Sequence, residues 1–389
     1  MGKKSVCFIA ALATSVCTSS VLAQEAYVIG LSGTMTGPNA DTYAPGVESV
    51  KLYVQQLNKR GGVNGKQLRL VISDNQGEPS RAAADAKKFI TQESAILIVN
   101  ISPSSTYGPM VAESRRARVP LLFAGAGCPA EVLPPNADEI QFCSISAAMK
   151  HDAEAALGYI KEQSKEPTKL GLVAMAIPLS RGGIDYAESI APSFGITPVQ
   201  KEIIPPATPD YTPFASKLKA AEPNWVYAWG PWVTQIKTFE SLRKLGWNGK
   251  YIGAALNPAE EELARVKDDK LYVFGANAMF FENLPVHQEI REAASKANLT
   301  YPVTQLSEGW VAGLVIEQAL KATPVPATPE KLLATMTTLK VDTKGLRGGP
   351  IEWTKTNHFR TKQYYRVYHW DATTKSLARA KDWITIDVK

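Results

Sequence analysis

Residue types that carry out chemistry are present in this chain, but they stand far apart in the sequence. The four histidines, His151, His287, His358 and His369, form neither an HExxH motif nor a cluster with cysteines. We therefore expect no metal site and no cofactor. Asp74 follows a predicted strand, yet no second acid or base is spaced around it for general acid–base catalysis. Hydrogen bonding within a turn is the simpler role for this aspartate.

Nucleophile and phosphate-binding motifs are absent from the sequence as well. It contains no GxSxG elbow and no P-loop. Gly125-Ala126-Gly127 lacks the third glycine of a dinucleotide fingerprint, so we interpret it as a tight turn after a strand. An enzyme with an α/β fold is thus the weaker hypothesis, and turnover of a small acid would be its sign.

Two turns instead carry side chains suited to binding a small molecule. Ser102, Ser104 and Ser105 lie just before a predicted helix, and hydroxyl and backbone N–H groups at a helix start bind anions. Such serines also cap helices without any ligand. Trp229 and Trp232 flank a second turn, where two indoles would suit a flat or apolar ligand or simply fill a core.

The elements that must position these turns follow an alternating pattern. Short apolar runs separate amphipathic segments, which is typical of stacked βαβ units. The first half has predicted strands at 26–31, 68–73, 96–99 and 121–124, and helices at 47–57, 81–91 and 107–116. A second series has strands at 169–174, 199–204, 225–229 and 251–254, and helices at 149–162, 183–194, 212–221 and 233–245. Continuous apolar strands joined by helices predict parallel sheets covered on both faces.

The last third of the chain changes character. Helices are predicted at 306–322 and 329–339, followed by antiparallel strands at 363–370 and 383–387. The predicted fold class is therefore α/β, with two doubly wound parallel-sheet lobes. Open sheets of this kind bind ligands outside the carboxyl ends of their strands, so two facing lobes would enclose a cleft.

Length and composition agree with two globular lobes. The chain has 389 residues, of which 45% are hydrophobic and 21% charged. Its formal net charge of +6 is modest for this length, and no stripe of lysine and arginine stands out. We therefore expect no nucleic-acid partner.

The first 23 residues are typical of a signal peptide. Lys3 and Lys4 precede an apolar stretch, Val6–Val16, and Val21–Ala23 supplies small residues for cleavage. The apolar stretch is too short to span a bilayer, and no later run reaches about 18 residues. We expect a soluble mature chain that starts near Gln24, with a formal charge of +4 after the loss of Lys3 and Lys4 from the +6 total.

Cleavage would leave two of the four cysteines. Cys7 and Cys17 lie in the leader, and the residues before Cys17 make a poor lipobox. Cys128 and Cys143 remain, and an oxidising compartment favours a disulfide between them that adds roughly 3 kcal/mol to stability. Two free, buried thiols are the alternative.

Several segments resemble, in order, the type I periplasmic solute-binding proteins of ABC transporters, in the leucine/isoleucine/valine-binding branch. Residues 29–38 (IGLSGTMTGP) look like the opening strand and loop, and 57–66 (LNKRGGVNGK) look like the end of the first helix. Residues 73–79 (SDNQGEP) are similar to the turn that follows. The similarity continues through 308–310 (EGW) to 349–351 (GPI), so it covers nearly the whole mature chain.

This resemblance implies two α/β lobes that are joined by three crossovers and close on a ligand as a hinged clamp. The signal peptide would be 1–23, lobe 1 would comprise 24–147 plus 276–354, and lobe 2 would comprise 148–275 plus 355–389. The family also implies a periplasmic protein without enzymatic activity. A membrane permease and an ATPase would be its partners, and we expect a monomer because closure needs free lobes.

The sequence departs from the family where its amino-acid-binding members hold the zwitterion. Pro103 and Gly127 stand at the positions of the hydroxyl residues that bind the carboxylate, and Thr234 stands at the acidic position that binds the ammonium. A buried ammonium without a carboxylate costs several kcal/mol. An amino acid, amide or urea-like ligand would need a partner from elsewhere, such as Glu308. Arg181, where the family carries a tyrosine, would grip a carboxylate instead.

An aromatic or other small organic carboxylate is therefore the leading ligand hypothesis, as in the aromatic-acid-binding members of the branch. A sensory role, in which the closed form docks on a membrane receptor, remains an alternative. The candidate ligand-binding residues are Tyr43, Ser102, Ser104, Ser105, Thr106, Ala126, Gly127, Arg181, Trp229, Trp232, Thr234, Asn257 and Phe280.

Overall fold

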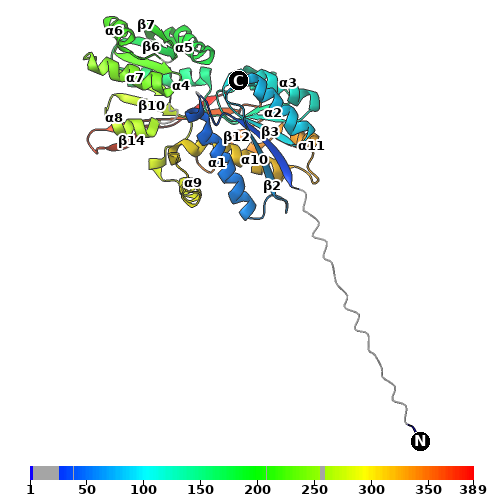
Figure 1. Ribbon diagram of the computed structural model, residues 1–389. Coiled ribbons are helices and arrows are strands. Elements are labelled where there is room, and N and C mark those ends of the chain that lie inside the picture. The colour runs from blue at the N-terminus through cyan, green and yellow to red at the C-terminus, as the bar shows by residue number, and fades with distance from the viewer. Residues whose placement is uncertain (3–25, 38, 207, 255–258) are drawn as a thin grey trace.

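The computed structural model describes residues 1–2, 26–37, 39–206, 208–254 and 259–389 (Figure 1). The expected signal peptide, apart from its first two residues, and the candidate ligand residue Asn257 lie outside the described residues. Within the described part, no helix combines the length and the apolar character that a membrane span requires.

Lobe 1 is the part of the protein built around a five-stranded sheet with the order β2-β1-β3-β4-β5, in which every strand pair is parallel. Its strands are β1 (Tyr27–Gly33), β2 (Leu68–Asp74), β3 (Leu97–Ile101), β4 (Leu121–Phe123) and β5 (Gln141–Cys143). Its helices are α1 (Ala40–Lys59), α2 (Pro79–Thr91), α3 (Tyr107–Ala117), α9 (Pro285–Lys296), α10 (Ser307–Ala322) and α11 (Pro329–Met336). A short ribbon, β11 (Lys340–Val341) with β12 (Ile351–Glu352), and the 3₁₀ turns η1 (Ser104–Thr106), η2 (Ala130–Val132), η4 (Phe280–Glu282) and η5 (Val303–Leu306) complete it.

Alternate residues of the lobe 1 strands enter two different cores. In β3, Leu97, Val99 and Ile101 pack with α1 and α10, whereas Ile98 packs with α2 and α3 on the other face. This period of two is what a strand buried on both faces requires. It explains why the strands of this lobe are continuous apolar runs in the sequence.

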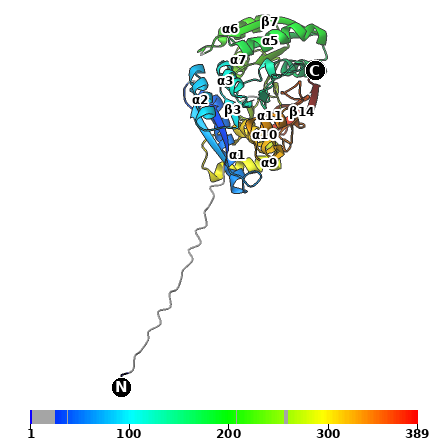
Figure 2. The same cartoon turned by 90° about the vertical axis from the view of Figure 1, so that its right-hand side faces the viewer.

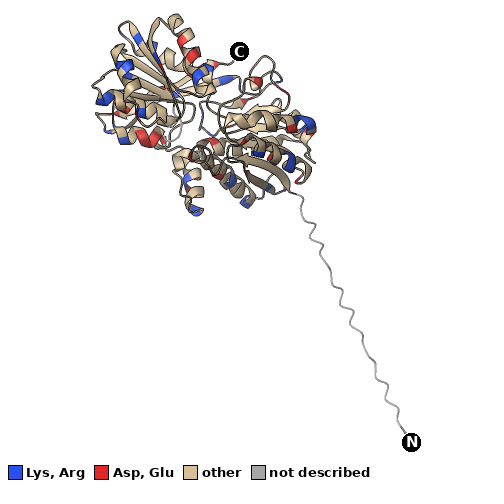
Figure 3. Ribbon diagram, turned by 45° about the horizontal axis from the view of Figure 1, so that its top comes forward, with Lys and Arg blue, Asp and Glu red and all other residues tan. Residues whose placement is uncertain are grey.

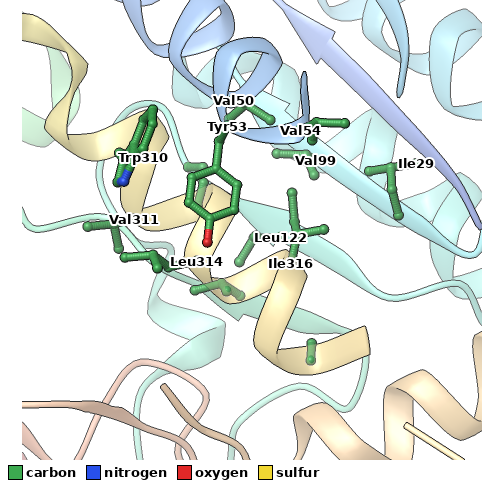
Figure 4. Packing of buried hydrophobic residues seen from close by; sticks show 14 of the residues in the cluster. Ile29, Val50, Tyr53, Val54, Val99, Leu122, Trp310, Val311, Leu314 and Ile316 are labelled. Atoms are coloured by element: carbon green, nitrogen blue, oxygen red, sulfur yellow. The ribbon is translucent and has the colours of Figure 1, made fainter. Parts of the chain in front are cut away.

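The α1–α10 contact is the largest helix pairing in lobe 1, and it depends on small residues. Figure 4 shows the Tyr53 and Trp310 rings side by side between the two helices; their centroids lie 5.0 Å apart in an edge-to-face arrangement. A Cβ atom on Gly313 of α10 would lie 2.3 Å from the Tyr53 Cγ atom. The glycine therefore lets α1 approach closely enough to bury the tyrosine ring.

Lobe 2 is built around a seven-stranded sheet with the order β14-β13-β10-β9-β8-β6-β7. Its strands are β6 (Thr168–Met175), β7 (Ile196–Ile204), β8 (Trp225–Trp229), β9 (Lys250–Ala254), β10 (Leu271–Gly275), β13 (Lys362–Asp371) and β14 (Ser376–Asp387). Its helices are α4 (Met149–Gln163), α5 (Pro178–Ile190), α6 (Thr212–Ala220), α7 (Trp232–Lys244) and α8 (Ala259–Val266), with the 3₁₀ turn η3 (Ala191–Phe194). β6 to β10 are parallel, whereas β13 is antiparallel to both β10 and β14.

The two-lobed arrangement predicted from the sequence is confirmed (Figures 1 and 2). Each predicted strand and helix is present, but α1 begins at Ala40 rather than near residue 47, and β14 begins at Ser376 rather than at 383. Helix α5 starts at Pro178 rather than near residue 183, because a proline at the first helical turn favours initiation. Among the described residues, four strands and two helices escaped prediction: β5, β10, β11 and β12 have two to five residues each, whereas α8 has eight and α9 has twelve.

The chain passes between the two sheets three times. It leaves β5 for α4, returns after β10 to η4 and α9, and crosses again from β12 to β13. The strands of each sheet fall within the lobe ranges expected from the sequence, although the boundaries of the lobes stay a prediction.

Candidate functional site

The described candidate residues, apart from Phe280, lie at or just after the carboxyl ends of parallel strands. In lobe 1 they follow β1, β3 and β4, and in lobe 2 they lie at or after the ends of β6 and β8. Because the strands of each sheet are parallel, their carboxyl ends share one edge. This common edge is the reason that residues far apart in the sequence meet.

Ser102, directly after β3, is tied into the fold. Its side chain is fully buried, and its Oγ accepts a hydrogen bond from Asn75 Nδ2 at 2.6 Å. The same amide group also donates to Ser32 Oγ, and its Oδ1 accepts from Thr34 Oγ1, each at 2.8 Å. Ser102 therefore links the ends of β1, β2 and β3.

Of the next three candidate residues, two are exposed and one is buried. Ser104 and Ser105 are exposed at the start of η1, which continues directly into α3. Thr106 is buried, where its hydroxyl donates to the Pro103 carbonyl at 2.8 Å and accepts from Asn100 Nδ2 at 2.9 Å. The two serines, and not Thr106, are thus accessible to a solute at this helix start.

The turn after β4 is held by a tyrosine and a disulfide. Tyr107 Oη donates to the Gly127 carbonyl at 3.0 Å, while Ala126 is half-buried beside it. Cys128 and Cys143 form the disulfide favoured by the sequence, with their Cα atoms 5.7 Å apart. Tyr43 is half-buried near Tyr107, and burial raises the pKa of its phenol to about 12, so it stays neutral at physiological pH.

Trp229, the last residue of β8, points into the core of lobe 2. Its side chain is 4% exposed, and its indole N–H donates to Asp152 Oδ2 at 2.8 Å. Asp152 also accepts from the Tyr365 hydroxyl at 2.5 Å and from the Ala148 N–H at 3.2 Å. The Trp229 carbonyl accepts from Ser180 Oγ at 2.6 Å. These hydrogen bonds hold Trp229 in the core and fix the start of the turn that follows it.

Trp232 and Thr234 begin α7 and are likewise buried, with 6% and 1% of their surfaces exposed. Among the described residues, neither Trp232 Nε1 nor Thr234 Oγ1 has a hydrogen-bond partner. Val233 between them is 48% exposed and is the side chain that this turn presents to solvent. Gln235 Nε2 fixes the turn by donating to the Gly230 carbonyl at 2.8 Å.

Arg181 lies exposed in the first turn of α5. Within the described part of the chain, it forms no ion pair. Its guanidinium is thus accessible to an anion from solution.

Phe280 is placed away from the strand-end loops. Its ring is 3% exposed within the lobe 1 core and stacks on His287, with centroids 4.4 Å apart. Its backbone N–H and that of Phe281 donate to the Glu260 carboxylate of α8, at 2.7 and 2.8 Å. Phe280 therefore fastens lobe 1 to lobe 2 beside the second crossover.

Glu308, the alternative ammonium partner, is already engaged. Its Oε2 accepts from Arg347 Nη2 at 3.1 Å and from the Ser146 N–H at 3.2 Å, and its Oε1 accepts from Asn277 Nδ2 at 2.5 Å. Arg360 lies near Arg347 and donates to the Ile145 carbonyl. Burial lowers the pKa of both guanidinium groups. This polar cluster joins the three crossovers.

Asp152, Arg347 and Arg360 were not anticipated from the sequence. Their partners are 77, 39 and 215 residues away along the chain, so no local spacing could indicate them. A buried charged residue is recognisable only when its surroundings are known.

Other features of the surface lie outside the strand-end loops. Among the described residues, no group of histidine, cysteine and acidic side chains is arranged to hold a metal ion. Figure 3 shows basic and acidic residues interspersed over both lobes. Two hollows of about 600 and 320 Å³ lie elsewhere, one between α4 and β14 and the other among α1, α9 and α10.

Comparison with curated proteins finds relatives among the amino-acid-binding proteins. The chain is 34% identical over 97 residues to a leucine-, isoleucine-, valine-, threonine- and alanine-binding protein of Pseudomonas aeruginosa, which is 25% of this chain and 26% of that protein. It is 23% identical to an amino acid binding protein of the same species over 65% of this chain and 66% of the other. The chain thus spans from a quarter to just under two thirds of these relatives' lengths.

Solved structures share the fold over almost the whole chain. A branched chain amino acid ABC transporter protein from Thermus thermophilus with bound valine has a TM-score of 0.78 at 17% identity, covering 93% of this chain and 97% of the other. A solute binding protein of an ABC transporter from Rhodopseudomonas palustris BisB5, in complex with 3,4-dihydroxybenzoic acid, has a TM-score of 0.73 at 18% identity, covering 93% and 98%.

The sequence profile of one family spans both lobes. The profile described as periplasmic binding protein matches residues 26–375, a range that includes every strand named above except β14. Together with the two sheets and their three crossovers, this match shows that the chain belongs to the periplasmic binding protein family.

Proposed function

We propose that this protein is the periplasmic substrate-binding component of an ABC uptake transporter and that its ligand is a small aromatic or other organic carboxylate. The ligand binds between the strand-end loops of the two lobes and is released to a membrane permease driven by an ATPase. The protein acts by binding alone, without turnover of the ligand. A single protomer carries the whole site.

The proposed ligand class rests on one observation: neither Glu308 nor the residue at position 234 offers a free carboxylate to an ammonium group. Glu308 is engaged with Arg347, Asn277 and Ser146. The lobe 2 turn offers Thr234, a neutral residue whose side chain is buried. An ammonium group in this site would lose water without gaining a free carboxylate, at a cost of several kcal/mol.

Groups that suit an anion are accessible instead. Arg181 is exposed on lobe 2, and Ser104 and Ser105 are exposed at the start of η1 on lobe 1. A guanidinium binds a carboxylate through two parallel hydrogen bonds, and a helix start adds N–H donors. A ligand held from both lobes binds the closed state better than the open one, so it shifts the population towards closure.

An amino acid remains the second candidate because the relatives named above bind amino acids. Such a ligand would have to compete with Arg347 for Glu308, or recruit a carboxylate from elsewhere. The polar cluster at the crossovers opposes this, since removing one partner of a buried ion pair is strongly destabilising.

Calorimetric titration of the mature protein decides between the two classes. The probes are 3,4-dihydroxybenzoate, benzoate, cinnamate and aliphatic acids on one side, and leucine, valine and amides on the other. We expect binding of the acids only. Because a bound ligand stabilises the folded state, an acid at a concentration a hundredfold above its dissociation constant should raise the free energy of unfolding by about 2.7 kcal/mol. Binding of leucine without binding of any simple acid would contradict the proposed ligand class and leave the transport role intact.

A further inference from the structure

The two lobes touch directly between the strand-end loops, at Gly127 and Leu179. Gly127 follows β4 in lobe 1, and Leu179 is the second residue of α5 in lobe 2. A Cβ atom built on Gly127 would lie 2.7 Å from Leu179 Cδ2, 3.6 Å from Cδ1 and 3.7 Å from Cγ. The end of the leucine side chain therefore occupies the place where a side chain at position 127 would project.

The close contact with Leu179, and not the backbone conformation, is the constraint on a larger residue at position 127. Gly127 has no positive φ angle, unlike Gly230 with φ +148°. Other residues adopt such a backbone without strain. The three nearest atoms that a Cβ at position 127 would meet all belong to the end of the Leu179 side chain, which would have to shift, so the two positions must be considered together.

Both sides of the contact are fixed in place. The Gly127 carbonyl accepts from Tyr107 Oη at 3.0 Å, and the adjacent Cys128 is bonded to Cys143. Next to Leu179, Ser180 Oγ accepts from the Met175 N–H at 3.0 Å and donates to the Trp229 carbonyl at 2.6 Å. The contact therefore joins the loop after β4 to the first turn of α5, and hydrogen bonds or a disulfide hold both segments in place.

We propose that Leu179 is a specificity-determining residue of the interlobe site. By filling the space above Gly127 with hydrocarbon, it makes this part of the site apolar, so the ring or alkyl portion of the ligand lies here and its carboxylate lies towards Arg181 and the exposed Ser104 and Ser105. This inference rests on the proposed function, because it assigns one residue of the proposed ligand site.

A double-mutant cycle between Leu179→Ala and Gly127→Thr tests the inference. We expect Leu179→Ala to weaken 3,4-dihydroxybenzoate binding at least about fivefold, because the ring loses an apolar partner. Gly127→Thr alone should weaken it at least about tenfold, since threonine collides with Leu179. In the Leu179→Ala background the same threonine should cost less than about threefold, because the space is then free.

Two matched variants control for unrelated effects. Gly108→Thr changes a glycine of α3 in the same lobe, where a Cβ would meet nothing within 4 Å. Val325→Ala shortens an exposed side chain between α10 and α11, outside the strand-end loops. Both should leave the affinity within about twofold of the wild type, so that a larger change in either would overturn the assignment to Leu179.

Urea unfolding of the same variants without ligand separates this inference from the proposed function. Gly127→Thr should lower the midpoint when Leu179 is present and lower it less in the Leu179→Ala background, whatever the ligand is. If the wild type binds neither 3,4-dihydroxybenzoate nor leucine while this coupling persists, the ligand class fails and the lobe contact stands. Additive effects in both unfolding and binding, or an unchanged affinity of Leu179→Ala, would overturn the role of Leu179.

Discussion

Two titratable residues beside the second crossover, the half-buried Glu260 and the buried His287, respond to pH in opposite directions. Burial raises the pKa of the Glu260 carboxyl to about 7, although two backbone N–H groups donate to it. Burial lowers the pKa of His287 to about 4. Both residues contact Phe280, so the pH dependence of this junction is the sum of two opposed effects.

For Glu260, the folded pKa is above the unfolded one. Its contribution to stability is therefore fully present below about pH 4.5 and is lost as the pH rises through about 7. We expect the free energy of unfolding of the wild type, relative to Glu260→Gln, to fall by at most about 3 kcal/mol over this interval. Urea titrations of both proteins from about pH 4.5 to 8 measure the difference. A constant difference across that range would contradict the raised pKa.

For His287, the folded pKa is below the unfolded one, so its contribution is present above about pH 6.5 and is lost as the pH falls towards 4. In the Glu260→Gln protein, the opposite pH dependence of the glutamate is removed and that of His287 remains. We therefore expect Glu260→Gln to lose stability more steeply than the wild type when the pH falls from about 6.5 to 4.5. The same urea titrations show the slope, and a variant whose stability does not fall over this interval would be incompatible with a neutral, buried histidine.

Arg181 is the residue whose removal tests the proposed anion site most directly. Arg181→Ala should weaken binding of 3,4-dihydroxybenzoate more than tenfold if the guanidinium contacts a desolvated carboxylate, which is on the order of 1.4 kcal/mol or more. Lys237→Ala, a change in an exposed cation of α7, is the matched control and should leave the affinity unchanged. Calorimetry measures both, and equal affinities of the wild type and Arg181→Ala would remove Arg181 from the site.

At the scale of the elements, the close contact between α1 and α10 fixes the core of lobe 1. Gly313→Ala introduces a Cβ atom 2.3 Å from Tyr53 Cγ, and the ring is also held by its hydroxyl, which donates to Glu317. Neither partner can move freely, so we expect a loss of about 1–3 kcal/mol from overpacking. Thermal unfolding compares it with Gly108→Ala, whose Cβ enters open space and should cost nothing. A Gly313→Ala protein as stable as the wild type would mean that the helices separate without cost.

At the scale of the whole molecule, the disulfide braces the lobe 1 loop that touches the other lobe at Leu179. Cys128 and Cys143 are separated by 15 residues, and closing a loop of this size stabilises a fold by roughly 3 kcal/mol. We expect Cys128→Ser/Cys143→Ser to unfold at correspondingly lower urea concentration. The wild type in reducing buffer should shift in the same direction, whereas the double variant should not respond to reductant. No shift in either case would show that the loop is rigid without the bond.

The elements and the two-lobed fold were predictable from the sequence because their signals are local. Apolar strands such as β3 and β8 are continuous runs, and helices such as α1 repeat apolar residues at helical spacing. The strands that escaped prediction were short, such as β5 with three residues, too few to show a period, and the helices α8 and α9 escaped as well. The resemblance to the periplasmic binding proteins added the crossovers, which no local pattern contains.

In the candidate site, too, the local features were predictable and the long-range contacts were not. The order of strands and loops along the chain was enough to place the candidate residues at the sheet edges. Folding of the lobes was needed to show that Trp229 turns inward to Asp152, that Glu308 is engaged by Arg347, and that Leu179 covers Gly127. Each of these contacts joins residues separated by 39 or more positions along the chain, and the packing of whole lobes selects such pairs.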